Sequence, residues 1–477
     1  MEGKVLFVLA TTGISTGLMG SSSSVERLIR LRKCGFEQYY DVEFVDKYIR
    51  EHKNKEIFGF SWKTGNLVGQ WIASSITTES KILDEPISLE TLRNELNNDD
   101  YTHVVFCTAL DGYSLAAKSA RVLKQEFSNL TTICVLEGAL VSESKKDFDH
   151  VFRGNYVLKM RRLLKEPFKR PYTVPMTTAK TTSRFMGIEK NAVYGIMFTS
   201  EGCPNACDFC QVSLLHGSKY KCLFTKNQIM DGIEHLCSIV EEKRKEINLR
   251  DDSEIVISLA EPIGLYDINM WLEIFNEFKY DIEVSLCVPT SAQVMERYVR
   301  NGLEKLTRGS LHLRSVNIGV ESMVRPYPKN KGTNLKTLSR NLQRNGISAH
   351  FSLILGFDWH DRKTVWTDVE KMVDLEATGY IVQSLEIYPG TRIYRQLAEQ
   401  GRMLRVPPEF LALQGYLAFK HPKFKSGFND MLPLLDEVSE LIDNRNNPQI
   451  LNELSVFLNR PNIVNERLKH LTGLCSR

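Results

Sequence analysis

Three cysteines lie within eight residues of one another, in the stretch Cys203-Pro-Asn-Ala-Cys207-Asp-Phe-Cys210. Thiolates this close together suit a metal cluster better than a disulfide. A four-iron, four-sulfur cluster is normally held by four cysteine thiolates, so three ligands leave one iron open. Catalytic metal sites keep such a position open for water or substrate. The spacing therefore predicts Cys203, Cys207 and Cys210 as ligands of a reactive iron–sulfur cluster.

A structural zinc site is the main alternative, and three free thiols are another. Zinc sites usually combine a C-x2-C pair with a second pair of ligands about 15 residues away. His216 and Cys222 follow the cysteine loop, but not at that spacing. The pattern therefore favours a cluster over zinc.

The cysteine loop directly follows the first strand in a series of six strand–helix units. Strands are expected at Val193–Thr199, Glu254–Leu259, Ile282–Val288, Ser315–Val320, Ser348–Leu355 and Ile381–Ile387. Helices are expected at 225–246, 268–279, 291–301, 334–345, 362–376 and 391–400. Six parallel units can curve into a partial (β/α)6 barrel. In the related closed barrel the active site lies on the loops after the strands, which is where the cysteines fall.

The first 155 residues also alternate between strand-like and helix-like runs. Strands are expected at Val5–Ala10, Asp41–Val45, Ile57–Ser61, His103–Thr108 and Thr131–Leu136. Helices are expected at Val25–Lys33, Leu67–Ser80, Leu89–Leu96 and Tyr113–Phe127. This alternation predicts a Rossmann-like, doubly wound parallel sheet. Ligands would bind beyond the carboxyl ends of its strands, at the loops Thr11–Ser24, Ala109–Gly112 and Glu137–Ser142.

We therefore expect an α/β chain with four parts. They are a Rossmann-like domain at 1–155, a connector at 156–190, a partial barrel at 191–402 and a helical C-terminal region at 403–477. In the last part, Leu432–Ile442 and Leu451–Leu458 have amphipathic patterns. A length of 477 residues accords with about three domains.

Composition narrows the class of protein. A net charge of +3 gives no argument for a nucleic-acid partner. No stretch reaches the 18 or so apolar residues of a membrane span, and the apolar run near the start is too short for a signal peptide. The ten cysteines are scattered and form no disulfide framework. These features predict a cytoplasmic protein with no membrane span.

The C-x3-C-x2-C spacing resembles the signature of the radical S-adenosylmethionine (radical SAM) superfamily. The resemblance implies that the open iron binds S-adenosyl-L-methionine (SAM) and that an electron from the cluster splits its sulfonium. That electron would come from an external reductant such as flavodoxin or ferredoxin. Phe209, the aromatic residue before the last cysteine, is implied to pack beside the adenine.

Motifs on the later strands strengthen the resemblance. Glu261-Pro262 matches half of a Gly-Gly-Glu-Pro motif whose glutamate binds the SAM amino group, although Leu259 and Ala260 replace its glycines. The sequences around Glu321, Gly356 and Tyr388-Pro-Gly-Thr are similar to the radical SAM subgroup that has an N-terminal cobalamin-binding domain. The resemblance implies that Glu321 contacts the SAM ribose or amino group and that Gly356 lies beside adenine.

The N-terminal domain resembles that subgroup's cobalamin-binding domain more weakly. Ala109 and Gly138 are in the small-residue loops that would lie under the corrin ring. The Asp-x-His-x-x-Gly motif that ligates cobalt in many cobalamin proteins is absent. The resemblance implies cobalamin as a cofactor, and methylation of an unactivated carbon of a small metabolite as the reaction.

Three other functions stay open. The subgroup includes radical rearrangements and cyclisations. A methylthiotransferase would need three more cluster cysteines in the first domain, where Cys34, Cys107 and Cys134 are available. A non-catalytic scaffold would keep the cluster without needing a SAM pocket, and an electron-transfer protein would need a fourth cysteine ligand, either Cys222 or a distant residue. No residue can be assigned as catalytic from the sequence.

Overall fold

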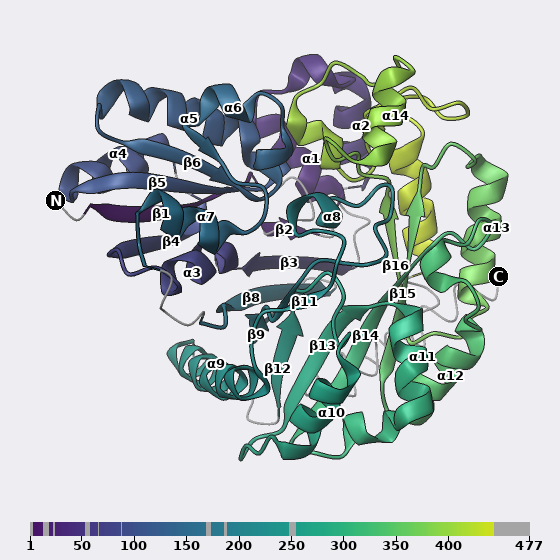
Figure 1. Cartoon of the computed structure of the whole chain (residues 1–477). Coiled ribbons are helices and arrows are strands. Elements are labelled where there is room, and N and C mark those ends of the chain that lie inside the picture. Colours follow the sequence, from purple (N-terminus) through teal and green to yellow (C-terminus); the bar gives the residue numbers. More distant parts are fainter. Residues whose placement is uncertain are drawn as a thin grey trace.

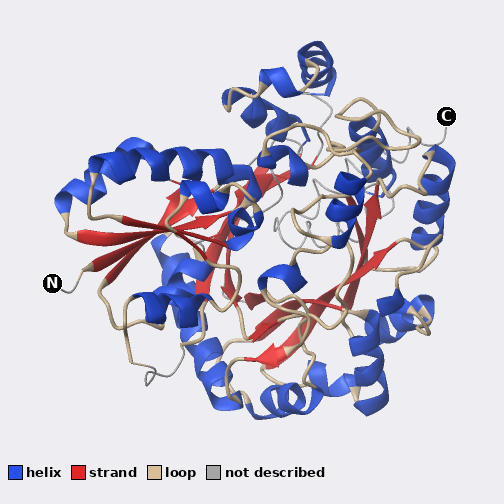
Figure 2. Ribbon diagram, turned by 45° about the horizontal axis from the view of Figure 1, so that its top comes forward, coloured by secondary structure: helices blue, strands red, loops and turns tan. Residues whose placement is uncertain are grey.

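The structure is a computed structural model that describes residues 3–12, 19–21, 24–52, 58–64, 66–86, 88–167, 173–185, 188–247 and 254–442. Its strands form a five-stranded sheet, a nine-stranded sheet and a two-stranded sheet (Figure 1). Helices surround the two larger sheets (Figure 2). Among the described residues, no helix is long and apolar enough to cross a bilayer.

The five-stranded sheet is built from the N-terminal part of the chain. Its elements are β1 (Lys4–Ala10), α1 (Ser24–Lys33), η1 (Glu37–Tyr39), α2 (Val42–His52), α3 (Leu67–Ser74), β4 (Ser80–Pro86), α4 (Leu89–Asn98), β5 (Tyr101–Thr108), η2 (Leu110–Gly112), α5 (Tyr113–Glu126), β6 (Thr131–Val135), η3 (Leu136–Leu140), α6 (Ser144–Asp147), β7 (His150–Val151) and α7 (Tyr156–Leu163). All its strand pairs are parallel, in the order β4-β1-β5-β6-β7. Leu6 and Val8 pack with α1, α2, α4 and α5, whereas Val5 and Phe7 pack with α3 and α7. Helices therefore cover both faces, which confirms the Rossmann-like doubly wound fold.

The nine-stranded sheet forms the partial barrel. Its elements are β2 (Met19–Ser21), β3 (Phe58–Thr64), β8 (Met176–Phe185), β9 (Ile188–Met197), α9 (Lys226–Glu246), β12 (Ile255–Leu259), α10 (Ile268–Glu277), β13 (Val284–Thr290), α11 (Ala292–Asn301), η4 (Leu303–Thr307), β14 (Leu311–Glu321), η5 (Pro328–Asn330), α12 (Leu335–Arg344), β15 (Ser348–Leu355), α13 (Arg362–Val373), β16 (Gly379–Ser384) and α14 (Arg392–Glu399). The six strands from β9 to β16 are parallel, and β8, β3 and β2 extend the sheet in antiparallel fashion. The six predicted strand–helix units and the partial (β/α)6 barrel are confirmed.

Alternation along the barrel strands separates a core from an open face. On β13, Val284, Leu286 and Val288 are buried in the layer beneath the helices. Ser285 and Cys287 face the opposite, concave side of the sheet, which we call the lumen. Five of the outer helices begin at side-chain caps that accept a backbone N–H, namely Asp267, Ser291, Asn334, Asp361 and Thr391. Such caps satisfy the unpaired donors of a first turn and fix where each helix starts.

Two predictions about the N-terminal elements are wrong, and a third is right about the strand but not about the sheet to which it belongs. The strand expected at Asp41–Val45 lies at the start of α2, because Val45, Tyr48 and Ile49 have helical spacing and are buried together. The helix expected at Leu67–Ser80 ends at Ser74, and β4 follows it. Only one neighbour pairs with β4, and an edge strand tolerates the charged residues that masked it in the sequence. The strand expected at Ile57–Ser61 exists as β3, but it pairs with β8 in the barrel sheet.

The C-terminal region contacts both larger sheets. It contains η6 (Pro408–Ala412) and a helix at 431–442, which agrees with the prediction for Leu432–Ile442. Phe410 and Tyr416 pack in the core of the first domain, whereas Leu417 and Phe419 pack in that of the barrel. The helix predicted at Leu451–Leu458 lies outside the described residues. In the segment expected to be a connector, α7 is followed by the β8–β9 hairpin.

Candidate active site

The cysteine loop begins just after the end of β9, and its two ends are held together. Two short strands, β10 (Ser200–Glu201) and β11 (Lys221–Cys222), pair antiparallel and close it at the base. The Cys203 amide donates to the carbonyl oxygen of Gly217 at 3.1 Å. Gly202 has a φ of +76°, and a Cβ there would lie 2.0 Å from the carbonyl oxygen of Lys219. Only glycine fits this position without moving the loop.

The three thiols are half-buried and near one another. Burial raises the pKa of Cys207 to about 12 and that of Cys210 to about 11, and the charge of Cys203 adds to both shifts. These thiols therefore need a bound cation in order to ionise at neutral pH. Among the described residues, no three His, Cys, Asp or Glu side chains could hold one metal ion together.

Two residues considered as further ligands are engaged elsewhere. The Cys222 thiol donates to the carbonyl oxygen of Phe224 at 3.2 Å. The His216 ring lies edge-on to Tyr156, with ring centroids 6.0 Å apart, and its Nδ1 is 3.8 Å from a Glu201 carboxylate oxygen. Neither side chain completes a four-ligand set with the three cysteines.

Loops after the later barrel strands hold the cysteine loop from the other side. The Phe209 ring packs edge-on against Tyr327 and Phe357, with centroids 5.3 and 6.0 Å away. The Tyr327 hydroxyl donates to the Asp208 carboxylate at 3.2 Å. The Ile393 amide, in the first turn of α14, donates to the Asp208 carbonyl oxygen at 3.1 Å. Phe209 therefore lies where the loops after β14, β15 and β16 meet.

Glu261 connects the end of β12 to the base of the cysteine loop. Its side chain is buried, and its carboxylate accepts hydrogen bonds from the Thr199 amide at 3.0 Å, the Thr199 hydroxyl, and the Ser200 hydroxyl at 2.7 Å. Burial raises the pKa of Glu261 to about 7, against the lowering effect of these bonds. These hydrogen bonds use much of the acceptor capacity of the Glu261 carboxylate, for which the sequence resemblance implies a contact with the SAM amino group.

Glu321 ends β14 beside a lysine that the sequence analysis did not single out. It has a left-handed φ of 68° and forms an ion pair with Lys329. Both side chains are nearly buried, and the positive charge of Lys329 acts on Cys207 and Cys210. Asn330 fixes this arrangement by donating to the carbonyl oxygens of Gly319 and Val320, each at 3.1 Å. In the sequence, Lys329 immediately precedes Asn330-Lys331-Gly332, which belongs to the stretch after Glu321 that resembles the radical SAM subgroup.

Gly356 follows β15 with a φ of +99°. Its amide donates to His360 Nδ1 at 3.0 Å, so the His360 Nε2 proton faces the Asp368 carboxylate, also at 3.0 Å. Asp368 in turn accepts a hydrogen bond from the Ser322 hydroxyl, next to Glu321. This buried relay ties the loop carrying Gly356 to the loop carrying Glu321.

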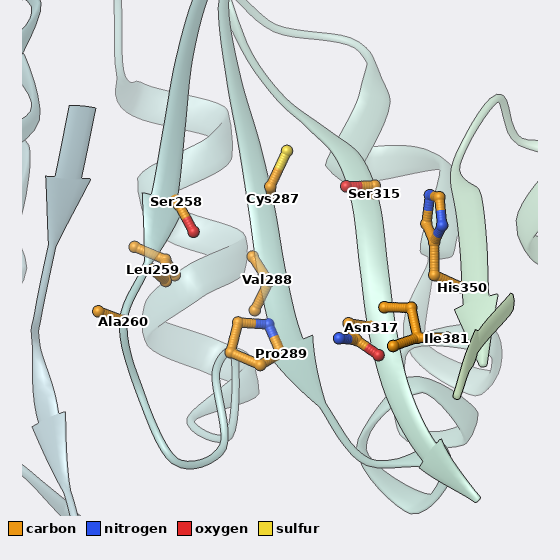
Figure 3. A pocket seen from close by; sticks show the side chains of 10 residues that line it. All are labelled: Ser258, Leu259, Ala260, Cys287, Val288, Pro289, Ser315, Asn317, His350 and Ile381. Carbon is orange, nitrogen blue, oxygen red and sulfur yellow. The ribbon is translucent and has the colours of Figure 1, made fainter. Parts of the chain in front are cut away.

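A cavity of about 450 Å³ opens in the lumen (Figure 3). Its polar lining is neutral apart from one imidazole and comes from five neighbouring positions: Ser258, Cys287, Ser315, Asn317 and His350. Strand register explains the grouping, because Cys287 pairs with Ser258 and Ser315, and Asn317 pairs with His350. Sequence reasoning missed this set, although polar residues alternating with apolar ones along β15 indicate an open face.

The loops after β5 and β6, at the carboxyl edge of the first sheet, are buried, whereas most of the predicted ligand loop Thr11–Ser24 lies outside the described residues. Ala109 is 4% exposed, Leu110 1% and Asp111 0%. Gly138 faces its own domain, because a Cβ there would lie 2.7 Å from Thr108 Cγ2. Ala109 and Gly138 thus lie where predicted in the fold, but the described residues of this edge do not fit a bulky, flat corrin ring.

Comparisons with known proteins bear on the fold. No family model matches the chain, and no curated protein matches its sequence. Two solved structures of the radical SAM methyltransferase TsrM from Kitasatospora setae are similar in structure. The one with cobalamin and a [4Fe-4S] cluster bound has a TM-score of 0.52 and 12% identity, over 84% of this chain and 78% of that one. The one with tryptophan and the SAM analogue aza-SAM bound has a TM-score of 0.53 and 12% identity, over 83% and 76%. The resemblance to the cobalamin-domain subgroup of radical SAM proteins is thereby confirmed at the level of the fold.

Proposed function

We propose that this chain is a radical SAM enzyme in which Cys203, Cys207 and Cys210 hold a four-iron, four-sulfur cluster and SAM binds at its open iron. The observation that carries the proposal is the cysteine loop itself. Three thiols lie on the loop after β9, at the carboxyl-end side of the six parallel barrel strands, and the next cysteine along the chain, Cys222, bonds to the Phe224 carbonyl oxygen instead. When bound, the cluster supplies the electron that cleaves SAM to an adenosyl radical, which takes hydrogen from an unactivated carbon.

The protein's own residues position and shield this chemistry. The loops that carry Glu321 and Gly356 lie beside the cysteine loop, and Tyr327 and Phe357 on these loops pack against Phe209 and position it. Lys329 places a positive charge near the thiolates and offsets part of their negative charge. Glu261 fixes the base of the loop through Thr199 and Ser200. Preorganised groups of this kind lower the cost of holding reactants in place.

The lumen indicates the class of substrate. Its lining offers hydroxyl, amide, thiol and imidazole groups but no carboxylate, lysine or arginine. A charged substrate group would be left without a partner there, which is costly. We therefore infer that the reacting part of the substrate is a small, uncharged group that forms hydrogen bonds. TsrM has been solved with tryptophan bound, which supports a small-molecule substrate for this fold.

Cobalamin-dependent methylation of carbon, the reaction that the sequence resemblance implies, is supported by the likeness to TsrM, which was solved with cobalamin bound. The burial of Ala109 and Asp111 at the carboxyl edge of the first sheet counts against it, so it stands as the second candidate. Cobalamin-free rearrangement or cyclisation would use the same cluster and lumen. A methylthiotransferase is disfavoured because Cys107 and Cys134 are each 0% exposed, inside the first sheet. An external one-electron donor such as flavodoxin or ferredoxin is part of the proposal.

Anaerobic reconstitution tests the proposal. The purified chain is loaded with iron and sulfide, and SAM and dithionite are added. We expect 5′-deoxyadenosine from the wild type, and none from a Cys203→Ala/Cys207→Ala/Cys210→Ala variant. Cys222→Ala is the matched control and should behave as wild type. A four-iron cluster detected by electron paramagnetic resonance without any 5′-deoxyadenosine would refute the enzyme function and favour an electron-transfer role.

A further inference from the structure

We propose that the Rossmann-like domain of this chain holds no corrinoid. The described part of the carboxyl edge of its sheet is covered by the chain's own residues 404–416, and the domain instead braces the cysteine loop. This inference goes beyond the proposed function and rests on contacts within the fold. It therefore stands or falls separately from the radical chemistry.

The crevice between β1 and β5 is the position where a ligand of this sheet would bind. In chain order the five strands have the arrangement 2-1-3-4-5, so the connections reverse direction between β1 and β5. Doubly wound sheets bind ligands in the crevice at that reversal. Here Thr11, after β1, is 2% exposed, and Asp111, after β5, is 0% exposed. The Thr11 hydroxyl donates to the Asp111 carboxylate at 2.8 Å, so the two walls of the crevice bond to each other.

The glycines of these loops face inward. A Cβ on Gly112 would lie 2.3 Å from the carbonyl oxygen of Ala10, and one on Gly138 would lie 2.7 Å from Thr108 Cγ2. Glycine at such a loop can serve a close ligand or close packing of the loop on its own sheet. At both positions the nearby atoms belong to the sheet, so packing accounts for the glycines.

The C-terminal segment 404–416 covers the same edge. Glu409 accepts a hydrogen bond at 2.7 Å from the amide of Ser114, in the first turn of α5. Phe410 is 0% exposed, and its ring lies 5.7 Å from Phe36 and 4.9 Å from Tyr416. The Tyr416 hydroxyl donates to the Tyr39 carbonyl oxygen at 3.0 Å. An aromatic cluster buried to this degree is part of the domain core.

The acidic side chains at this edge are also engaged within the chain. Glu137 accepts hydrogen bonds from the Leu110 amide at 3.1 Å and from the Gln211 side chain at 3.3 Å. Glu386, at the end of the barrel sheet, accepts bonds from Tyr388 at 2.5 Å and Gln414 at 2.7 Å. A corrin ring would have to break these bonds and leave buried carboxylates without donors.

Contacts between the first domain and the cysteine loop indicate that the domain supports this loop. Gln211 is adjacent to Cys210, so its bond to Glu137 connects the first domain to the cysteine loop. A second contact lies at α8 (Val212–Leu215), where a Cβ on Gly154 would come within 2.0 Å of the Leu215 carbonyl oxygen. Figure 1 shows α8 between the five-stranded sheet and the barrel. The first domain thus supports the cysteine loop at two points.

The experiment uses the full chain, reconstituted with iron and sulfide, incubated with excess hydroxocobalamin and desalted. Corrinoid absorbance is measured alongside TsrM as a positive control. We expect no stoichiometric retention by this chain, and retention of one equivalent would overturn the inference. A Phe410→Ala variant that gains corrinoid binding would support the assignment of this segment as the filler. 5′-Deoxyadenosine is assayed on the same sample without corrinoid, and its absence would count against the proposed function only.

The bracing role has its own test. Glu137→Ala removes the acceptor for Gln211, and Glu137→Gln keeps an acceptor oxygen at the same place. We expect the alanine variant to lose cluster iron to a chelator about tenfold faster than wild type, the size of effect expected from one lost hydrogen bond of this kind. The glutamine variant should stay close to wild type. Equal rates for the alanine variant and the wild type would overturn the bracing role.

Discussion

Replacing Lys329 with methionine tests how far the Glu321–Lys329 ion pair is removed from water. The side chains are 12% and 8% exposed for the lysine and the glutamate, respectively. Methionine has a similar length and keeps the apolar stem, so the change mainly deletes the charge. Glu321 would then be a buried carboxylate without its cation. Breaking a buried pair in this way costs about 3–5 kcal/mol.

A double-mutant cycle separates charge from packing. Glu321→Gln/Lys329→Met removes both charges, and the double replacement of a buried pair by neutral groups is often close to neutral in stability. We therefore expect the double variant to recover most of the loss seen in Lys329→Met. The assay is urea unfolding of the cluster-free chain at pH 7.5, followed by tryptophan fluorescence. With a slope of about 3 kcal/mol/M, the single variant should unfold at about 1–1.7 M less urea.

Two results would refute this reasoning. A loss below about 1 kcal/mol for Lys329→Met would place the pair in the range of solvated surface ion pairs. A double variant as unstable as the single one would show that the lysine acts through its packed stem rather than its charge. Either result would also remove the basis for expecting Lys329 to influence the thiolates of the cysteine loop.

Three further predictions concern the cysteine loop and its base. Because the pKa of Glu261 is raised to about 7, the folded state holds its proton more tightly than the unfolded state does, and this term lowers stability as pH rises from about 4.5 to 7. Glu261→Gln should abolish this pH dependence. The unfolding free energy of the wild type minus that of the variant should therefore be up to about 3 kcal/mol lower at pH 8 than at pH 5. Gly202→Ala would place a Cβ 2.0 Å from the Lys219 carbonyl oxygen, so reconstituted protein should carry clearly less iron per chain than wild type; equal iron would show that the loop yields easily. Cys222→Ser should keep its full iron content, because the Cys222 thiol bonds to the Phe224 carbonyl oxygen, and lost iron would make it a ligand.

The barrel was largely predictable because its signals are local and repeated. The strand predicted at Ser348–Leu355 matches β15 to the residue, and helix 268–279 matches α10 to within two residues. Short apolar or alternating strands, such as β12 and β13, are followed by helices with an apolar stripe, and the repetition of this pattern identifies the units. The cysteine loop was predictable for a similar reason, since its spacing lies within a single short segment.

Pairing between distant segments was less predictable. Ile57–Ser61 has the composition of a strand, and β3 exists, but nothing local indicates that it pairs with β8 instead of β1. The lumen cavity was hard to predict for the same reason. Cys287 and His350 are ordinary residues on separate strands, and only the register between strands brings them to one cavity.

The carboxyl edge of the first sheet shows why a resemblance in local sequence does not determine a cofactor. Ala109 and Gly138 belong to loops of the kind that accept a ligand, and the sheet order places them where one would bind. A glycine that makes room for a cofactor and a glycine that packs on its own sheet have the same letter in the sequence. The difference lies in the neighbours that a Cβ would meet and in Phe410, which reaches the domain from the other end of the chain. Those contacts are long-range, so the sequence could indicate a corrinoid site while the tertiary structure fills it.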